Sequence, residues 1–280
     1  DLRSVVNTYN VQPSLAWKID DRFSIGGGVS VQYIEADLNN ALPNLSPLLA
    51  DGHSRVKGDD ISVGWNLGGR FESGPIAVGI HYRSQVKHRL KGEFTIEGLQ
   101  GPLAGANAVI DARAPITLPD SLGFSAAFKA SEKARILASA EWTNWSVFDA
   151  IRIQTPEGTA LSTSPQHYKD SWSFHLGGEY DLSDRWTVRT GVATDSTPTV
   201  DEYRTSRVPD GDRVWLTAGA SWKLSDTLEA RFSYAHVFVT TEPLDREDHF
   251  YAGAAAVTNN LRSENSGSVN MIGADFTVRF

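Results

Sequence analysis

Histidine is the side chain best able to move protons near neutral pH, and this sequence holds seven of them. No HExxH, GxSxG, Walker A, GxGxxG or EF-hand motif accompanies them, and cysteine is absent. None of the seven lies in a recognisable nucleophile context. They are scattered over the sequence as His53, His81, His88, His167, His175, His236 and His249. The sequence therefore predicts neither an enzyme active site nor a metal or cofactor site.

A charged pair, Lys169 and Asp170, stands at the start of a predicted strand. A lysine in a partly desolvated site can bind a carboxylate ligand through a charge-assisted hydrogen bond. The alternative is an exposed ion pair between the two residues, or a lysine anchored at a membrane interface. Lys169 is therefore a candidate ligand-binding residue, and both interpretations stay open.

Leucines are unusually dense in a predicted long loop, 37–58, which reads LNNALPNLSPLLADG over residues 38–52. Exposed apolar patches often mark binding surfaces. We therefore expect these leucines to form a groove that captures a hydrophobic ligand, or else to pack against neighbouring loops. The leucines of this loop are Leu38, Leu42, Leu45, Leu48 and Leu49. A second long segment invites the same comparison with Leu99, Leu103, Val109 and Ile110.

A third long segment concentrates charge around Pro209 and Gly211. The charged residues that surround these two are Arg204, Arg207, Asp210, Asp212 and Arg213. We expect a turn stabilised by ion pairs here, in preference to a ligand site.

The composition of the chain excludes some classes of protein. The 280 residues include 26 Lys and Arg against 34 Asp and Glu, a formal net charge of −8. This balance argues against nucleic-acid binding, which needs a basic surface. No run approaches the ~18 apolar residues that a transmembrane helix requires. A membrane β-barrel remains compatible, because its strands alternate in polarity and average to a low hydropathy.

Alternation is the main pattern along the chain. From Arg213, the residues Val214, Leu216 and Ala218 oppose Trp215, Thr217 and Gly219. Apolar residues recur at every second position, which indicates a strand with one apolar face, not a helix. Eleven such segments span about 6–19, 22–36, 59–73, 75–96, 116–130, 134–154, 168–182, 185–197, 213–224, 227–240 and 264–280.

The connections between these segments alternate in length. Five are tight and rich in Ser, Asp or Gly, which favour turns; they are Asp20-Asp21, Ser73-Gly74, Ser131-Glu132-Lys133, Ser183-Asp184 and Ser225-Asp226. The other five are long, about 37–58, 97–115, 155–167, 198–212 and 241–263. Successive connections of antiparallel strands lie at opposite ends, so one end has tight turns and the other has long loops. Outer-membrane barrels show this asymmetry.

The two faces differ in polarity. Aromatic residues such as Trp17, Phe71 and Trp222 fall on the apolar face near the tight turns, as in the aromatic girdles of membrane barrels. The other face carries Arg189, Glu229, Arg231 and Asp275, with His81 and His175, and charges facing a dry core would be costly. We therefore expect a transmembrane antiparallel up-and-down β-barrel, apolar outside and polar inside.

Several runs of the sequence resemble the FadL family of outer-membrane transporters for long-chain fatty acids, toluene and similar compounds. They are YRSQVKHRLKG (82–92), LPDSLGFSA (118–126), RTGVATDSTPT (189–199), VPDGDRVWLTAG (208–219) and HYKDSW (167–172). The resemblance implies a fourteen-stranded barrel with an N-terminal hatch. It further implies that residues 1–280 are one barrel domain from the C-terminal portion, in which the hatch and about three strands are missing.

The resemblance also implies the function: passive transport of hydrophobic small molecules across the bacterial outer membrane by a non-enzymatic, cofactor-free monomer that binds no nucleic acid. Leu42, Leu45, Leu48, Leu49 and Lys169 are the expected ligand-binding residues. The terminal Phe280 resembles the signal read by the barrel-assembly machinery. A polar porin, a structural barrel and a barrel enzyme are the alternatives; the leucine-rich loop favours the transporter over the porin.

Overall fold

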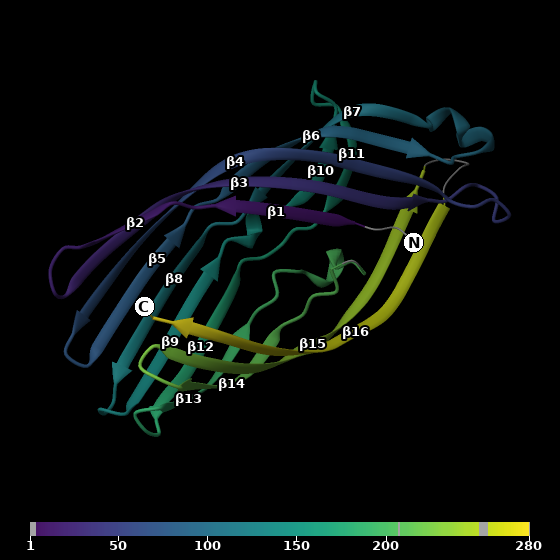
Figure 1. Cartoon of the computed structure of the whole chain (residues 1–280). Coiled ribbons are helices and arrows are strands. Elements are labelled where there is room, and N and C mark those ends of the chain that lie inside the picture. Colours follow the sequence, from purple (N-terminus) through teal and green to yellow (C-terminus); the bar gives the residue numbers. More distant parts are fainter. Residues whose placement is uncertain (1–3, 207, 252–256, 280) are drawn as a thin grey trace.

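A single antiparallel sheet of sixteen strands makes up the computed structural model, which describes residues 4–206, 208–251 and 257–279 (Figure 1). Three short 3-10 helices, η1 (Gly101–Ala106), η2 (Trp145–Val147) and η3 (Asp201–Tyr203), lie in the connections. No helix in the described ranges is long and apolar enough to cross a membrane. The strands are β1 (Val5–Val11), β2 (Ser14–Lys18), β3 (Phe23–Leu42), β4 (Gly52–Ser73), β5 (Ile76–Arg83), β6 (Val86–Glu97), β7 (Ala108–Leu118), β8 (Ser121–Lys129), β9 (Ala134–Thr143), β10 (Ala150–Gln154), β11 (Ala160–Pro165), β12 (Ser171–Asp181), β13 (Trp186–Asp195), β14 (Arg213–Lys223), β15 (Leu228–Phe250) and β16 (Val257–Val278).

The expected count of eleven strands is wrong, because four of the predicted segments are interrupted. The breaks separate β1 from β2, β5 from β6, β7 from β8 and β9 from β10. Pro13 and Pro119 lie at two of these breaks, where a missing N–H ends the ladder of hydrogen bonds. One further strand, β11, lies in the predicted loop 155–167 and pairs with β10.

The five predicted tight turns are confirmed, and they gather at one end of the sheet, called the turn end below (Figure 1). The Asp20 carboxylate accepts hydrogen bonds from the backbone N–H of Arg22 at 2.7 Å and of Phe23 at 2.8 Å. The hydroxyls of Ser131, Ser183 and Ser225 each accept a bond from the N–H three residues later. These short side chains close the turns as their types predict.

The opposite end, the loop end, contains more strand than the sequence indicated. β3 and β4 stay paired up to Leu42 and Gly52, which leaves only 43–51 as a connection. β15 and β16 likewise pair through most of the predicted loop 241–263. The expected loop boundaries are therefore wrong, because at the loop end the strands expose charged side chains on the face that is apolar elsewhere.

β6, β7, β10 and β11 form a branch of the sheet at the loop end that joins the main sheet along β4. β4 pairs with β5 near the turn end and with β6 near the loop end. The inner face of this branch buries two small apolar clusters. They are Ile34, Ala36, Leu90 and Ala114, and Val56, Phe94, Ala112 and Ile153. This buried packing fixes which face of β6 and β7 points outward.

The two faces of the sheet sort as the alternation predicts. Trp65, Leu216, Phe232 and Ile272 are exposed on the outward face, among many other large apolar side chains. On the inner face, Arg189, Glu229, Arg231 and Asp275 form a belt of polar contacts near the turn end. Arg189 pairs with Glu179 and Arg231 with Glu229, and Arg231 lies 3.7 Å from Asp275.

The sheet is not closed. Within the described residues β1 and β2 pair only with β3, and β16 pairs only with β15. The all-β antiparallel architecture expected from the alternation is confirmed, and in this chain it forms a strongly curved open wall (Figure 1). Phe280 lies outside the described residues.

Candidate functional site

The leucine-bearing connection 43–51 sits at the loop end between β3 and β4. Leu42 ends β3 and is half-buried, whereas Leu45, Leu48 and Leu49 are exposed by 40%, 93% and 37%. Side chains this apolar gain free energy by leaving water. Leu42, Leu45, Leu48 and Leu49 therefore offer an exposed apolar surface at the loop end, to which an apolar ligand could bind.

Asn44 holds this connection in place. Its side chain is buried, and its amide nitrogen donates to the carbonyl oxygens of Ala50 at 2.7 Å and Gly98 at 3.0 Å. Its amide oxygen accepts from the backbone N–H of Gln100 at 2.8 Å. Asn44 thus satisfies backbone groups of two different connections, 43–51 and 98–107.

The neighbouring connection 98–107 is ordered in the same way. Asn107 bonds the N–H of Leu99 at 3.0 Å and the carbonyl of Leu99 at 2.8 Å. Leu99 itself is buried, and Leu103 and Ile110 are half-buried, whereas Val109 is exposed on β7. The apolar residues of this second segment mostly pack inside it, so the exposed apolar surface belongs to 43–51.

Tyr251, which directly follows β15, contacts the leucine-bearing connection 43–51 from the other edge of the sheet. Its hydroxyl donates to the carbonyl oxygen of Pro43 at 3.0 Å, a contact that joins residues 208 positions apart. Burial raises the pKa of the Tyr251 hydroxyl, with a further contribution from the charge of Asp51. The β15–β16 hairpin and the leucine connection therefore meet at the loop end, although the strands behind them are not paired.

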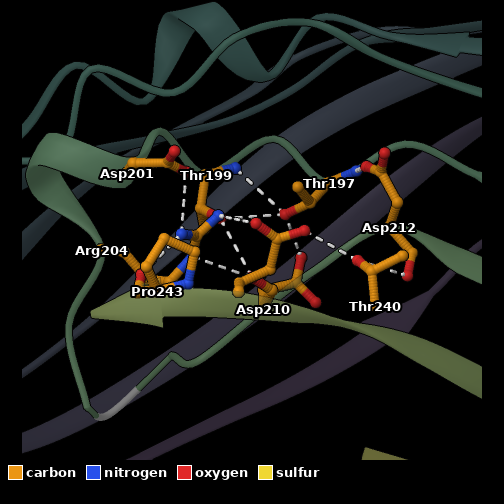
Figure 2. Close-up of polar contacts among 9 residues, drawn as sticks. Thr197, Thr199, Asp201, Arg204, Asp210, Asp212, Thr240 and Pro243 are labelled. Atoms are coloured by element: carbon orange, nitrogen blue, oxygen red, sulfur yellow. Dashed lines mark hydrogen bonds and ion pairs between the residues drawn. The ribbon is translucent and has the colours of Figure 1, made fainter. Parts of the chain in front are cut away.

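The predicted charged turn is confirmed, and Figure 2 shows it folded around Arg204. The guanidinium is only 1% exposed. It donates to the carbonyls of Asp210 and Pro243 at 3.0 Å each and pairs with Asp201 at 2.8 Å and Glu242 at 3.4 Å. Charge-assisted contacts of this kind offset the free-energy cost of removing the guanidinium from water. Arg207 lies outside the described residues.

Asp210 and Asp212 complete the turn. Asp210 pairs with Arg213 and accepts from the hydroxyl of Thr197 at 2.7 Å. Asp212 accepts from the backbone N–H of Thr197 at 2.7 Å, and its own carbonyl accepts from Thr240 (Figure 2). The connection between β13 and β14 is thus tied to β15, which places a rigid segment over the loop end.

Asp120 joins three strand breaks that the sequence did not show to be neighbours. It lies between β7 and β8, and its carboxylate accepts from the Tyr82 hydroxyl at 3.0 Å, from Gln85 at 3.1 Å and from Asn144 at 2.9 Å. Burial alone would raise the pKa of Asp120, but the hydrogen bonds from Asn144, Gln85 and Tyr82 outweigh it and hold that pKa below its usual value.

Lys169 stands apart from the leucines. Its side chain is exposed at the start of β12, and its backbone N–H donates to the Pro198 carbonyl at 2.9 Å. The neighbouring Asp170 carboxylate accepts from the Trp142 indole at 3.0 Å and from the N–H of Ser146 at 3.1 Å, and the described part of the chain shows no ion pair between Lys169 and Asp170. Within the described residues no contact joins Lys169 to 43–51.

A cavity of about 1030 Å³ lies against the main sheet and reaches from β4 to β16. Its lining includes His81, Ser125, His175, Arg189, Ser233 and Met271. His175 lies on the same face of β12 as Glu179, the partner of the inner-face Arg189, so its expected inward position is confirmed. His81 is paired through Gly123 with Glu141 on that same face. His81 lies 3.8 Å from Glu141, and a Cβ at position 123 would collide with its imidazole ring, so Gly123 makes room for it.

Sequence reasoning missed His88, the most deeply buried histidine. Its side chain lies on β6 with Nδ1 2.9 Å from an oxygen of Asp60 and Nε2 2.9 Å from the amide oxygen of Gln32. The signal was available, because His88 falls between Val86 and Leu90 on the buried positions of an alternating strand. Across the described chain no group of His, Asp and Glu is arranged to hold a metal ion.

An all-β antiparallel wall with an apolar outer face, a charged inner face, tight turns at one end and longer connections at the other is typical of proteins of the bacterial outer membrane. Residues 2–280 match the family model described as outer membrane protein transport protein (OMPP1/FadL/TodX), and the chain belongs to this family. The resemblance seen in the sequence is thereby confirmed, together with a location in the outer membrane.

Relatives and solved structures are consistent with this family assignment. The chain is 29% identical over 266 residues to a putative outer membrane protein of Neisseria meningitidis serogroup B, covering 86% of this chain and 56% of that protein. It is 25% identical over 308 residues to a long-chain fatty acid transport protein of Escherichia coli O6:H1, covering 98% and 67%. The crystal structure of a Pseudomonas aeruginosa FadL homologue superposes with a TM-score of 0.82 at 24% identity, covering 98% and 68%. The chain thus spans between about half and two thirds of these relatives.

Proposed function

We propose that the complete protein moves hydrophobic small molecules, such as long-chain fatty acids or aromatic hydrocarbons, passively across the outer membrane, and that it is not an enzyme. The observation that carries this proposal is the exposed leucine surface of 43–51 at the loop end, next to a wall whose inner side holds a cavity of about 1030 Å³. The relative in Escherichia coli is named for long-chain fatty acid transport, which supports the same substrate class.

Leu42, Leu45, Leu48 and Leu49 would capture the substrate. Apolar burial contributes about 25 cal/mol per Å², so covering ~200 Å² of a ligand supplies roughly 5 kcal/mol. That is enough for weak capture and permits release toward the cavity. Asn44 keeps the connection in one conformation, which reduces the entropy lost on binding.

Lys169 would act only on acidic substrates. Its ammonium group is exposed and forms no ion pair within the described part of the chain, so it is available to a carboxylate. A neutral hydrocarbon offers no such partner. Replacing Lys169 with alanine should therefore slow uptake of a fatty acid and leave uptake of toluene unchanged.

The test of the proposal replaces Leu42, Leu45, Leu48 and Leu49 with asparagine in the complete protein. Uptake of radiolabelled oleate and of toluene is measured in cells that depend on this protein. We expect uptake to fall at least about tenfold, because most of the apolar capture surface is lost. The control variant carries Leu182→Asn and Leu224→Asn, two exposed leucines at the turn end, and should retain uptake.

Unchanged uptake in the four-leucine variant, with normal amounts of folded protein in the membrane, would contradict capture by this surface. A second candidate function, a polar porin, is favoured by the charged inner face, where Arg189 pairs with Glu179 and Arg231 pairs with Glu229. Free passage of sugars through the complete protein in liposomes would establish the porin instead.

We further propose that the complete protein is a closed barrel of fourteen membrane-crossing strands that acts as a monomer. Eleven strands of this chain lie side by side near the turn end, and about three more would complete the barrel; the eleven are β2, β3, β4, β5, β8, β9, β12, β13, β14, β15 and β16. The curved wall and the free edges of β1 and β16 support closure by additional strands. We also retain the proposal that the barrel-assembly machinery recognises the last strand through Phe280.

A further inference from the structure

We propose that the outward face of β6 and β7 binds the phosphate groups of outer-leaflet lipid head groups. The site is a cluster of four cations, the basic patch: Lys87, Arg89 and Lys91 on β6 and Arg113 on β7. The family and the proposed transport do not require such a site, and it concerns the lipid around the protein instead of the substrate inside it.

Alternation along β6 fixes the direction of the basic patch. Val86, His88 and Leu90 are buried on the inner face of the branch, and the lysines and arginine between them are exposed. Since successive side chains of a strand point to opposite faces, the three cations of β6 share the outward face. The packing of Leu90 against Ile34 and Ala114 holds that orientation.

The basic patch begins where the apolar outer surface ends. Lys91 lies directly opposite Asp59 of β4, and directly paired residues share a face. The same face of β4 continues from Asp59 toward the turn end as Ile61, Val63 and Trp65, all of them exposed. Lys87 and Arg89 therefore lie at the margin of the apolar surface that faces the loop end. This is the level at which lipid head groups contact a membrane protein.

The three cations of β6 are not neutralised from within. In the described part of the chain Lys87, Arg89 and Lys91 form no ion pair, whereas the guanidinium of Arg113 donates to the Pro156 carbonyl at 3.0 Å and also interacts electrostatically with Glu157. Lys91 and Arg113 face each other directly across β6 and β7. Like charges placed opposite one another destabilise a sheet, so an anion between them would relieve the repulsion.

Acidic neighbours mark the limit of the patch. Asp59 flanks Lys91 on β4, and Glu93 and Asp111 form the next cross-strand pair away from the membrane. The cations of the adjoining strand β4 are neutralised, because Arg55 pairs with Asp37 and Lys57 pairs with Glu35. Unpaired cations are thus concentrated at the membrane margin, where lipid phosphates are found.

The experiment measures binding of diphosphorylated lipid A to the complete protein in detergent by native mass spectrometry. The test variant carries Lys87→Gln, Arg89→Gln and Lys91→Gln. The control variant carries Lys129→Gln, Lys133→Gln and Lys223→Gln, which removes the same charge from the turn end. We expect the test variant to bind at least about tenfold more weakly and the control less than about twofold more weakly, with binding weakened by added salt.

Equal affinity of the test variant and the unchanged protein would overturn the proposal, and so would equal binding of lipid A without phosphates. Displacement of the lipid by millimolar inorganic phosphate would overturn the assignment to a lipid, because it would show that the basic patch binds a free phosphate ion. Circular dichroism and oleate uptake by the test variant should be unchanged, which separates this site from the leucine surface and from loss of folding.

Discussion

Single buried polar side chains order the loop end of this molecule. Asn44, Asp120 and Arg204 each bond to groups from at least two separate segments. Buried polar groups are stabilising only when their partners are in place, and one missing partner costs about 1–3 kcal/mol. The stability of the loop end therefore depends on a few residues, and the loss of any one of them would remove contacts with more than one segment.

The Asp120→Asn variant tests this dependence. Its side chain receives three hydrogen bonds from donors, and an amide can accept fewer of them than a carboxylate. We expect the free energy of unfolding of the complete protein to fall by about 1–3 kcal/mol, measured by urea titration at neutral pH. Asp184→Asn, at an exposed tight turn, should change it little.

The effect of Asp120 should depend on pH with a defined sign. Its pKa in the folded protein is lower than the usual value of 3.8, so its stabilisation is fully present above about 3.8. As the pH falls through the lower, folded pKa, the carboxylate is protonated in both states and the stabilisation is lost. The difference between the unchanged protein and Asp120→Asn should therefore shrink at acidic pH; a constant difference would contradict this account.

Among the strands, exposure to lipid separates one face from the other. Leu216 on β14 points outward and Ser233 on β15 points inward. An arginine at an outward position near the middle of a membrane costs about 2–4 kcal/mol, whereas an arginine facing the inner side stays solvated. We expect Leu216→Arg to reduce insertion into lipid vesicles and Ser233→Arg to be tolerated. Equal insertion of both variants would count against the assigned faces.

The strands also show how far the sequence can be read. Alternation in 213–224 or 59–73 depends only on neighbouring residues, so the faces, the antiparallel arrangement and the tight turns were predictable. The strand breaks were not, because Asp120, Gln85 and Asn144 become partners only after three separate strands have paired. The loop-end strands were mistaken for loops, because their outward residues, such as Arg55 and Lys57, are charged and hide the apolar pattern. The candidate residues Leu42, Leu45, Leu48, Leu49 and Lys169 were located by sequence, and their roles stay a prediction.

For the whole molecule, the contact between Tyr251 and Pro43 links the first and last parts of the chain. Tyr251→Phe removes this hydrogen bond and should leave the sheet intact while widening the range of distances between the two parts. Because the chain lacks cysteine, spin labels can be attached at Leu48→Cys and Glu247→Cys and their distances measured by electron paramagnetic resonance. Tyr9→Phe, on exposed β1, is the control. An unchanged distance distribution in Tyr251→Phe would show that other contacts hold the two parts together.

The unequal lengths of the connections at the two ends bear on how such a wall enters a membrane. Tight turns such as Asp20-Asp21 and Ser225-Asp226 can remain on the side from which the chain arrives. The longer connections must cross the bilayer during insertion, and the one between β13 and β14 carries Arg204 and Asp210. A charged group cannot pass an apolar layer cheaply, so these segments must travel extended and find their partners only on the far side. The networks that order the loop end are therefore the last part of the molecule to form.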